Sequence, residues 1–252
     1  MLVLRAPSWG RSSLVTTRPS LFIAALLAAF SLLAGCGNPT PQPAPSTPSN
    51  PAPAPTIAAF RQLMVPYIPQ QTQVWCWAAS TAMAAAYMKN LPNVTDCEVL
   101  TEFDIRNGGP GLCCLTGECV QEGTIFEIQQ MLSQIFFINS QVIYSALSLQ
   151  QVQQYVGQGT PVIAHLSLGG FSGHFVVISG YDVNAGTVTV LDPFFGQYPN
   201  IPYSSVLFNP TLGSWDASLV ITSPPSSGTP CTIVPQFLPA YNATIYRIVC
   251  QY

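Results

Sequence analysis

The chain has 252 residues and carries few charges, with seven lysines and arginines against ten aspartates and glutamates for a formal net charge of −3. No basic run or basic patch occurs along the sequence, which argues against nucleic acid as a partner. Apolar residues make up 48% of the chain, and its length fits one domain with a sizeable core behind an N-terminal leader.

The first 35 residues are typical of a secretory signal peptide. Three arginines precede an apolar run at 21–33, and the small residues Ala34 and Gly35 then lead into Cys36. This ending resembles a bacterial lipobox, in which the cysteine is lipidated and becomes the first residue of the mature protein. An uncleaved transmembrane anchor is the alternative, although the apolar run is shorter than the roughly 20 residues that a spanning helix needs.

Residues 36–57 run from the lipidated cysteine into a segment with a proline at almost every second or third position. Proline favours extended polyproline II, so this segment is interpreted as a semi-rigid spacer. The folded domain is expected at 58–252. We therefore expect a monomer in the bacterial cell envelope, on the periplasmic or extracellular side, that contacts the membrane through the lipid at Cys36.

Three helices are predicted in the first part of the domain. The run 77–88 is rich in alanine and other helix formers, which places Cys76 at or just before a helix N-terminus. A second helix is predicted at 124–136, and a third at 148–156 with Ser148 as its N-cap.

After the third helix the chain has the pattern of β-strands, predicted at 161–168, 174–181, 187–192, 217–223 and 243–250. Helices first and antiparallel strands later predict an α+β domain of two unequal layers, a helical N-terminal part packed against a C-terminal antiparallel sheet. A functional site is expected in the cleft between the two layers.

The eight cysteines are informative in an exported chain, where disulfides persist. Lipid on Cys36 leaves seven, and six of them lie in turn-rich or terminal stretches suited to three disulfides: Cys97, Cys113, Cys114, Cys119, Cys231 and Cys250. Their pairing is open, although neighbouring Cys113 and Cys114 are expected to bond to different partners, and a bond between Cys231 and Cys250 would close the C-terminal segment. The seventh, Cys76, is left as a free and reactive thiol.

Zinc is the weaker interpretation of the cysteine cluster at 97–119. Adjacent cysteines make awkward tetrahedral neighbours, and no histidine lies nearby in the sequence. Neither a metal nor a cofactor is therefore expected.

Cys76 has the position that a nucleophile requires, because the partial positive charge of a helix N-terminus stabilises a thiolate. A base must accompany it, and the chain has two histidines. His174 begins an apolar strand after a glycine-rich loop, so its imidazole can face a cleft and act as the base. His165 lies between apolar residues inside a strand and is interpreted as a core histidine bonded to a backbone carbonyl.

Asp192 ends the strand 187–192 in an Asp-Pro turn. If this strand pairs with 174–181, Asp192 comes to lie beside His174, where its carboxylate can accept the Nδ1–H and fix the tautomer. Asp182, in the turn at the far end of the His174 strand, is the competing partner. A strand-ending turn without a chemical role is the other interpretation of Asp192.

Gln70 lies six residues before Cys76, in the loop that leads to the first helix. Its side-chain amide and the backbone N–H of Cys76 can hold an oxyanion between them, and one such donor contributes roughly 2.7–4 kcal/mol of transition-state stabilisation. Gln71 and Gln73 are near enough to be alternatives for this role.

These residues carry a resemblance to the papain-like cysteine peptidases. The pattern Gln-x5-Cys-Trp-Ala, a later Gly-His-Phe and a strand-ending Asp-Pro are all present. The opening at 65–80 is similar to the VPxIPQQ…WCWAAS of the bacterial C39-like and C70-like branch. The resemblance implies that Cys76 is the nucleophile, His174 the base and acid, Asp192 the orienting residue and Gln70 the oxyanion donor.

The sequence departs from papain around the cysteine, where the papain signature is Cys-Gly-Ser/Ala-Cys-Trp and this chain has Val74 and Trp75. Papain's substrate preferences therefore do not transfer. By its position, Phe194 is interpreted as the residue that shields the histidine. The tryptophans Trp75, Trp77 and Trp215 are expected in the core or the cleft wall.

The resulting hypothesis is an exported thiol hydrolase that cleaves peptide bonds of a peptide or protein substrate. A cell-wall peptide amidase is one alternative, but this class typically places an aspartate directly before the cysteine, where this chain has Trp75. A surface binding module on an inactive papain-like fold is the other; it would be expected to lack a catalytic residue, and none is missing.

Overall fold

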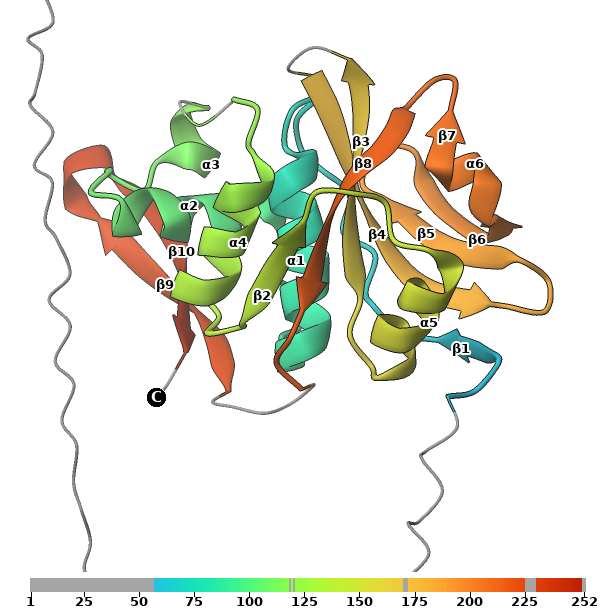
Figure 1. Ribbon diagram of the computed structural model, residues 1–252. Helices are drawn as coiled ribbons and strands as arrows, with labels where there is room; N and C mark the ends of the chain where they lie inside the picture. The colour runs from blue at the N-terminus through green and yellow to red at the C-terminus, as the bar shows by residue number, and fades with distance from the viewer. Residues whose placement is uncertain (1–56, 118, 120, 170–171, 225–229, 251–252) are drawn as a thin grey trace, which may run out of the picture. The chain divides into compact units, whose positions relative to one another are not determined.

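The computed structural model describes residues 57–117, 119, 121–169, 172–224 and 230–250 (Figure 1). The signal peptide, Cys36 and nearly all of the proline-rich spacer lie outside the described residues. Among the residues that are described, no helix is both long enough and apolar enough to span a bilayer.

The helices begin with clear local signals. α2, α4 and α5 each start at a threonine or serine N-cap whose side chain is paired reciprocally with a glutamate or glutamine three residues later. The helices are α1 (Cys76–Lys89), α2 (Asp96–Arg106), α3 (Cys113–Thr116), α4 (Ile125–Gln134), α5 (Leu149–Gly157) and α6 (Tyr203–Leu207), with a short 3-10 turn η1 (Pro239–Tyr241).

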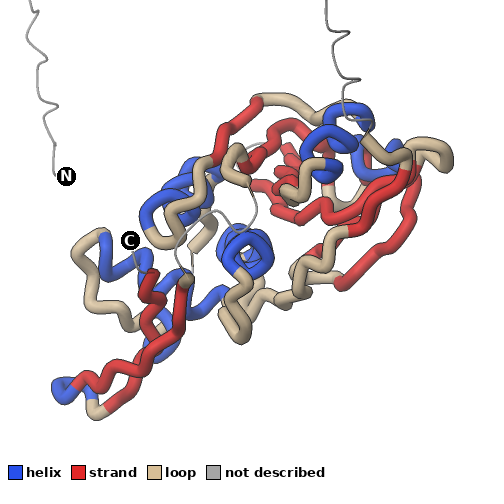
Figure 2. Tube along the Cα trace, turned by 90° about the horizontal axis from the view of Figure 1, so that it is seen from below, coloured by secondary structure: helices blue, strands red, loops and turns tan. Residues whose placement is uncertain are grey.

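Helix α1 is the centre of the core. Twelve of its 14 residues are buried, and its many small alanine side chains let neighbouring elements approach it closely. It packs against β4 on one side and against α2 and α4 on the other. Figure 2, turned by 90°, shows a helix end-on, with strands on one side of it and other helices on the opposite side. A helix that is apolar all round is expected in such a buried position.

The main sheet has eight strands in the order β2-β8-β3-β4-β5-β6, with β1 added to β4 and β7 added to β8. All of these pairs are antiparallel. The strands are β1 (Phe60–Gln62), β2 (Ser140–Ile143), β3 (Val162–Gly169), β4 (Ser172–Asp182), β5 (Thr187–Asp192), β6 (Gly196–Pro202), β7 (Phe208–Asn209) and β8 (Gly213–Ile221).

Strands β9 (Cys231–Leu238) and β10 (Ala243–Cys250) form a separate two-stranded sheet. This hairpin packs against α2, as Figure 1 shows. Its ends are joined by the Cys231–Cys250 disulfide. The Arg247 guanidinium binds both carboxylate oxygens of Glu102 on α2, at 2.6 and 3.2 Å, and the Glu102 side chain is only 1% exposed. An ion pair thus joins the hairpin to the helical layer.

The predicted α+β class, with helices N-terminal and an antiparallel sheet C-terminal, is confirmed. The predicted helices correspond to α1, α4 and α5, and the predicted N-cap Ser148 is in place. The interpretation of everything after residue 161 as strands is wrong at α6 and η1. The strand at 243–250 exists but lies outside the main sheet. Helix α2 and strands β1, β2, β6, β7 and β9 were not predicted.

Candidate active site

Cys76 is the first residue of α1 and the one free cysteine among the described residues. It is 7% exposed. Trp75, at the N-cap position, offers no side-chain cap. The first-turn backbone N–H groups therefore have no side-chain acceptor there, and the partial positive charge of the helix end lies at the thiol.

The two tryptophans that flank Cys76 fix the start of the helix, as expected for core and cleft-wall residues. Trp75 is 3% exposed and Trp77 1%. The Trp75 indole donates to the Cys119 carbonyl at 2.9 Å and the Trp77 indole to the Gln121 carbonyl at 3.3 Å. Gly123 lies so close to the Trp77 ring that a Cβ there would come within 2.0 Å of it. These contacts from Cys119, Gln121 and Gly123 therefore hold the start of the helix in place.

His174 lies on β4, opposite Leu166 of β3. Its Nε2 is 2.8 Å from Asp192 Oδ1, and the two side chains are 12% and 1% exposed. The prediction that Asp192 receives Nδ1–H is therefore wrong about the ring nitrogen, because Nε2 faces the carboxylate. This orientation leaves Nδ1 as the nitrogen available to the Cys76 thiol.

The surroundings of His174 favour its protonated form. Burial lowers the pKa of His174, but hydrogen bonds to Asp192 and to Cys76 and the charges of both partners outweigh burial and raise it from 6.5 to about 9. At neutral pH the imidazole is then an imidazolium between a carboxylate and a sulfur. Such a charge distribution is the one that pairs with a thiolate.

The two carboxylate oxygens of Asp192 differ in their hydrogen bonding. Oδ1 accepts from His174 Nε2 at 2.8 Å, from the Phe194 N–H at 2.9 Å and from the Phe195 N–H at 3.1 Å. Oδ2 is buried and has no hydrogen-bond partner in the described part of the chain. Asp182, the competing partner, instead accepts two backbone N–H groups of its own turn, those of Asn184 and Ala185.

The aromatic residue beside His174 is Phe195, whose ring lies edge-on to the imidazole with the two ring centroids 6.4 Å apart. Phe194, the residue that sequence position predicts to shield the histidine, packs on Phe195 with ring centroids 4.7 Å apart. Both rings are about half exposed, at 50% and 52%. They therefore form the rim of the cleft at this point.

Gln70 lies where the loop before α1 meets the Asp192 turn. Its backbone N–H donates to the Pro193 carbonyl at 2.9 Å. Its side-chain Nε2 donates to the Thr72 carbonyl at 2.6 Å, while Oε1 is buried without a partner among the described residues. A primary amide has two N–H groups, so a second donor of Nε2 remains.

Asp96 anchors this loop, a role that sequence reasoning missed. It is the first residue of α2 and fully buried, and it accepts the Gln71 N–H at 2.7 Å. Burial raises the pKa of Asp96 to about 6, although hydrogen bonds from the backbone N–H groups of Gln71 and Cys97 lower it. The Gln71 side chain binds Thr95, whereas Gln73, the other alternative to Gln70, lines the cleft.

His165 is not the core histidine that was expected. Its Nδ1 lies 2.6 Å from Asp216 Oδ1 rather than on a backbone carbonyl, and the two side chains are 24% and 49% exposed. Its Nε2 lies 2.0 Å from the position that a Cβ on Gly173 would take. His165 therefore lies in the cleft wall, a location that depends on a partner 51 residues away and that no local pattern indicates.

A cleft of about 450 Å³ collects these residues. Gln70, Cys76 and His174, predicted from far-apart segments, all line it, and Asp192 lies directly behind His174. Its other lining residues are Gln73, Val74, Glu122, Gly123, His165, Leu168, Gly173, Phe175, Phe194, Phe195, Thr211 and Leu212. The cleft lies between α1 and the main sheet, where the two layers meet.

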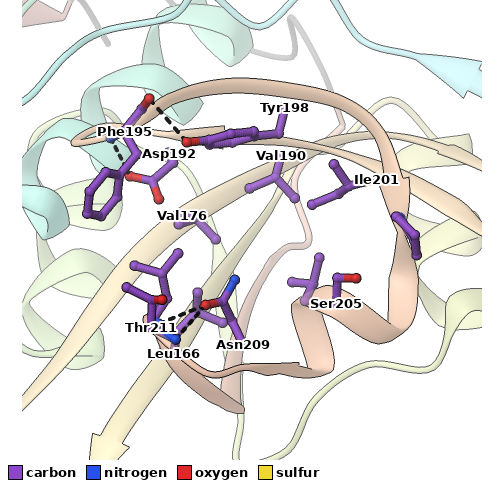
Figure 3. Close-up of a pocket in the computed structure, with 13 residues that line it drawn as sticks. Leu166, Val176, Val190, Asp192, Phe195, Tyr198, Ile201, Ser205, Asn209 and Thr211 are labelled. Carbon is purple, nitrogen blue, oxygen red and sulfur yellow. Dashed lines mark hydrogen bonds between the residues drawn. The ribbon is translucent and has the colours of Figure 1, made fainter.

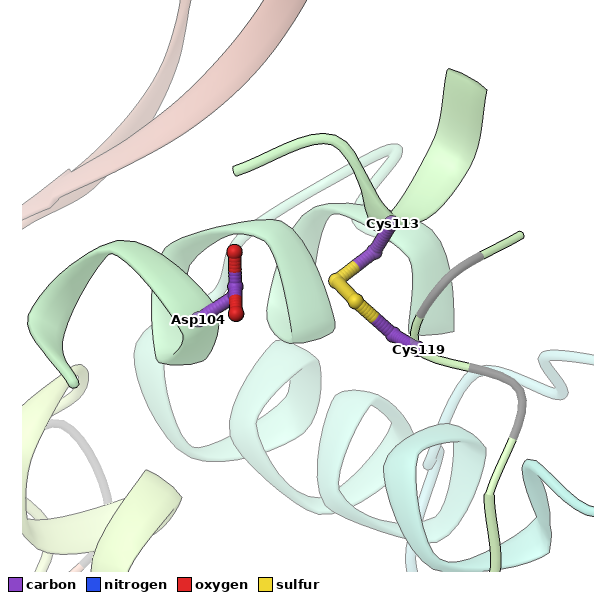
Figure 4. Close-up of side chains that lie close together, drawn as sticks. All are labelled: Asp104, Cys113 and Cys119. Atoms are coloured by element: carbon purple, nitrogen blue, oxygen red, sulfur yellow. A yellow bond between two sulfur atoms is a disulfide. The ribbon is translucent and has the colours of Figure 1, made fainter. Parts of the chain in front are cut away.

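The remaining cysteines are paired as Cys97–Cys114, Cys113–Cys119 and Cys231–Cys250. Neighbouring Cys113 and Cys114 thus have different partners, as predicted. Among the described residues, Asp104, Cys113 and Cys119 are grouped closely enough to suggest metal ligands (Figure 4). Their two sulfurs are bonded to each other, however, and a disulfide sulfur is not the thiolate that zinc requires.

Comparison with known proteins gives one family. The model described as the Peptidase_C39 like family matches residues 62–218, which is more than half of the chain and includes Gln70, Cys76, His174 and Asp192. No curated protein matches the chain. Among solved structures, xylellain, a cysteine protease from Xylella fastidiosa, is similar with a TM-score of 0.41 and 13% identity, over 67% of this chain and 87% of that chain.

Proposed function

The chain belongs to the Peptidase C39-like family, and we propose that it is an exported, lipid-anchored thiol peptidase with Cys76, His174 and Asp192 as its catalytic triad. The single observation that carries the proposal is the position of His174. It contacts the one free thiol of the described chain on one side and a buried carboxylate on the other, in the same cleft.

The geometry suits acyl transfer. The Cys76 thiolate attacks the scissile carbonyl carbon, and the carbonyl oxygen becomes an oxyanion held by the Cys76 backbone N–H and the free N–H of Gln70 Nε2. His174, protonated at neutral pH, gives its proton to the leaving amine as the C–N bond breaks. A thioester of Cys76 remains.

Hydrolysis of the thioester completes the cycle. Neutral His174 accepts a proton from water as the water oxygen attacks the thioester carbonyl. Collapse of the second tetrahedral intermediate releases the carboxylic acid and returns the thiolate–imidazolium pair. Asp192 holds the imidazole through Nε2 in both steps, and the chemistry needs no metal or cofactor.

Export to an oxidising compartment agrees with the three disulfides and the free Cys76. The lipobox-like ending at Cys36 and the proline-rich spacer support attachment to a membrane surface of the bacterial cell envelope. In this proposal the domain is a monomer that acts on peptides or proteins close to that surface.

The proposal is tested by turnover of a fluorogenic peptide library by the full chain carrying Cys36→Ala. Cys76→Ala and His174→Ala are expected to abolish turnover, while His165→Ala, the matched change of the other cleft histidine, keeps it measurable. Loss of turnover in His165→Ala together with retained turnover in His174→Ala would overturn the assignment of His174 as the catalytic base. Cell-wall peptides belong in the same panel, because turnover of these alone would favour the amidase alternative.

A second test needs no substrate. Iodoacetamide is expected to label one thiol of the unreduced protein rapidly near pH 6, at Cys76, and more slowly in the His174→Ala variant. Rapid labelling at another cysteine, or labelling only above pH 8, would contradict the thiolate–imidazolium pair and favour a binding module without activity.

A further inference from the structure

The loop that carries Gln70 is fixed at two consecutive backbone N–H groups. The Gln70 N–H donates to the Pro193 carbonyl at 2.9 Å, directly after β5. The Gln71 N–H donates to Asp96 Oδ2 at 2.7 Å, at the start of α2. The loop is therefore held from the sheet at one residue and from the helical layer at the next.

The anchor on the sheet side belongs to a turn that is itself held by hydrogen bonds. Asp192 Oδ1 accepts the Phe195 N–H at 3.1 Å, and the Tyr198 hydroxyl donates to the Phe195 carbonyl at 3.3 Å (Figure 3). Pro193 lies within this turn. One end of the loop is thus fixed by the same turn that holds Asp192 beside His174.

The anchor on the helical side lies at a well-fixed helix start. Thr95 caps α2 through a reciprocal pair of bonds with Glu98, and the Cys97–Cys114 disulfide joins the next residue to α3. The positive end of the helix favours a carboxylate in its first turn. Asp96 therefore presents its carboxylate to the loop from a fixed position.

Asp96 is a costly side chain to bury. It is 0% exposed, and the groups that shift its pKa are backbone N–H groups and the Glu98 carboxylate, with no cation among them. Its Oδ1 has no hydrogen-bond partner in the described part of the chain. Because burial of a carboxylate without a paired cation costs free energy, an apolar residue would fill this space more favourably. What Asp96 supplies, and an apolar residue lacks, is the acceptor for the Gln71 N–H.

The side-chain amide of Gln70 is fixed to the same short segment. Its Nε2 donates to the Thr72 carbonyl at 2.6 Å, so the ring closed by this bond includes the backbone of Gln71. The position of the amide therefore follows the position of Gln71.

We propose that Asp96 is a positioning residue, whose bond to the Gln71 N–H holds the Gln70 amide where it donates to the oxyanion. This inference rests on the proposed peptidase function, in which Gln70 is the oxyanion donor. A misplacement of about 1 Å in a catalytic group can cost about 10²-fold in rate, so loss of this anchor is expected to reach the chemistry although Asp96 touches no substrate.

The first arm of the test measures kcat and KM separately on a peptide that the full chain carrying Cys36→Ala cleaves. Asp96→Ala is expected to lower kcat by about 10–10²-fold with KM within about twofold, because an oxyanion donor acts only in the transition state. Asp96→Asn keeps an acceptor for the Gln71 N–H and is expected to stay within about fivefold of the parent kcat. Equal losses in the two variants, or a change in KM alone, would overturn the proposal.

A double variant distinguishes positioning of Gln70 from a general effect on the fold. In a Gln70→Ala background the oxyanion donor is already absent, so Asp96→Ala is expected to lower kcat by less than about threefold further. A further loss as large as the loss in the parent chain would show that Asp96 acts independently of Gln70, and would overturn the proposal.

Asp104→Ala is the matched control. Asp104 lies on the same helix, and its Oδ2 likewise accepts a backbone N–H at 2.7 Å, that of Gly111 in another loop. This variant is expected to keep kcat within about twofold of the parent chain. A loss comparable to that of Asp96→Ala would mean that any weakening of α2 lowers turnover, which would overturn the specific role of Asp96. If Asp96→Ala does not fold, Asp96→Leu, which fills the space and offers no acceptor, takes its place.

Amide hydrogen exchange followed by NMR tests the anchor without a substrate. The Gln70 and Gln71 amides are expected to exchange about tenfold or more faster in Asp96→Ala, while the Ala79 amide, bonded within the first turn of α1, stays unchanged. Unchanged exchange at Gln70 and Gln71 would overturn the anchor. If no peptide is cleaved by any form of the chain, the proposed function falls, and this arm still decides whether Asp96 holds the loop.

Discussion

Replacing Asp192 by asparagine and by alanine separates the negative charge of this side chain from its hydrogen bonds. Three donors converge on Oδ1, those of His174, Phe194 and Phe195, and no donor among the described residues reaches Oδ2. Asparagine can therefore keep all three bonds with its carbonyl oxygen and place its amide group where Oδ2 was. Alanine keeps none of them.

The two substitutions are expected to differ strongly in stability. A hydrogen bond to a charged group contributes about 1.5–3 kcal/mol and a neutral one about 1 kcal/mol. Loss of three bonds to the carboxylate in Asp192→Ala then costs about 4.5–9 kcal/mol, a large part of the 5–15 kcal/mol that stabilises a typical domain. Asp192→Asn keeps the three bonds but weakens each to about 1 kcal/mol, and is expected to cost about 1.5–6 kcal/mol.

The charge itself is expected to act on His174. Its pKa of about 9 depends on the hydrogen bond and the charge of Asp192, so Asp192→Asn is expected to move that pKa down toward 6.5. The alkaline limb of turnover, where the imidazolium is lost, then moves to lower pH. Turnover near pH 6 is expected to fall less than turnover near pH 8.

Urea unfolding at pH 7 and the pH dependence of kcat/KM measure these two effects. Asp182→Asn and Asp182→Ala are the matched control, because Asp182 also accepts backbone N–H groups with Oδ1 but lies in a distant turn. Equal destabilisation by Asp192→Asn and Asp192→Ala would refute the convergence of bonds on Oδ1. An unchanged alkaline limb in Asp192→Asn would refute the role of the charge.

Four further outcomes are expected. Wild-type turnover falls as pH rises through about 9, where His174 loses its proton; an alkaline limb near pH 7 would contradict this. Because the folded-state pKa of His174 is raised above 6.5, the contribution of His174 to stability is full below pH 6.5 and is lost as pH rises through 9. Gln70→Ala lowers kcat by about 10²–10³ if it removes an oxyanion donor, and a change in KM alone would argue against that role. Glu102→Ala removes the buried carboxylate that pairs with Arg247 and Arg106, whose side chains are 25% and 33% exposed. The charges left behind are partly solvated, so this substitution is expected to cost about 1–3 kcal/mol in thermal unfolding, whereas a cost below about 1 kcal/mol would show that the pairs behave as surface ion pairs. Mass spectrometry of the membrane-bound protein finds lipid at Cys36, and an intact signal peptide would rule this out.

The sequence predicts some parts of this fold and site better than others, for physical reasons. An alanine-rich run makes α1 apparent, and hairpin geometry brings Asp192 to His174 because the turn between β4 and β5 is short. Which imidazole nitrogen faces Asp192 depends on the position of α1, which no local pattern contains. The pairing of His165 with Asp216 likewise depends on the register of β3 against β8.

Helix α2 has a capping signal in the sequence that predicts its start. Thr95 and Glu98 form the same reciprocal cap as the start of α5, which Ser148 did reveal. The β9–β10 hairpin is different, because strand propensity gives no information about which sheet a strand joins. Its placement follows from a charge pair with Glu102 and from the Cys231–Cys250 bond, both of which are tertiary.

The bond between Cys113 and Cys119 links the chemistry of the thiol to the maturation of the chain. It closes the short loop whose Cys119 carbonyl holds the Trp75 indole, directly before Cys76. Before that bond forms, the loop lacks its covalent closure. In the proposed exported peptidase, the cysteine that must stay reduced is therefore set in place by a neighbouring pair that must become oxidised.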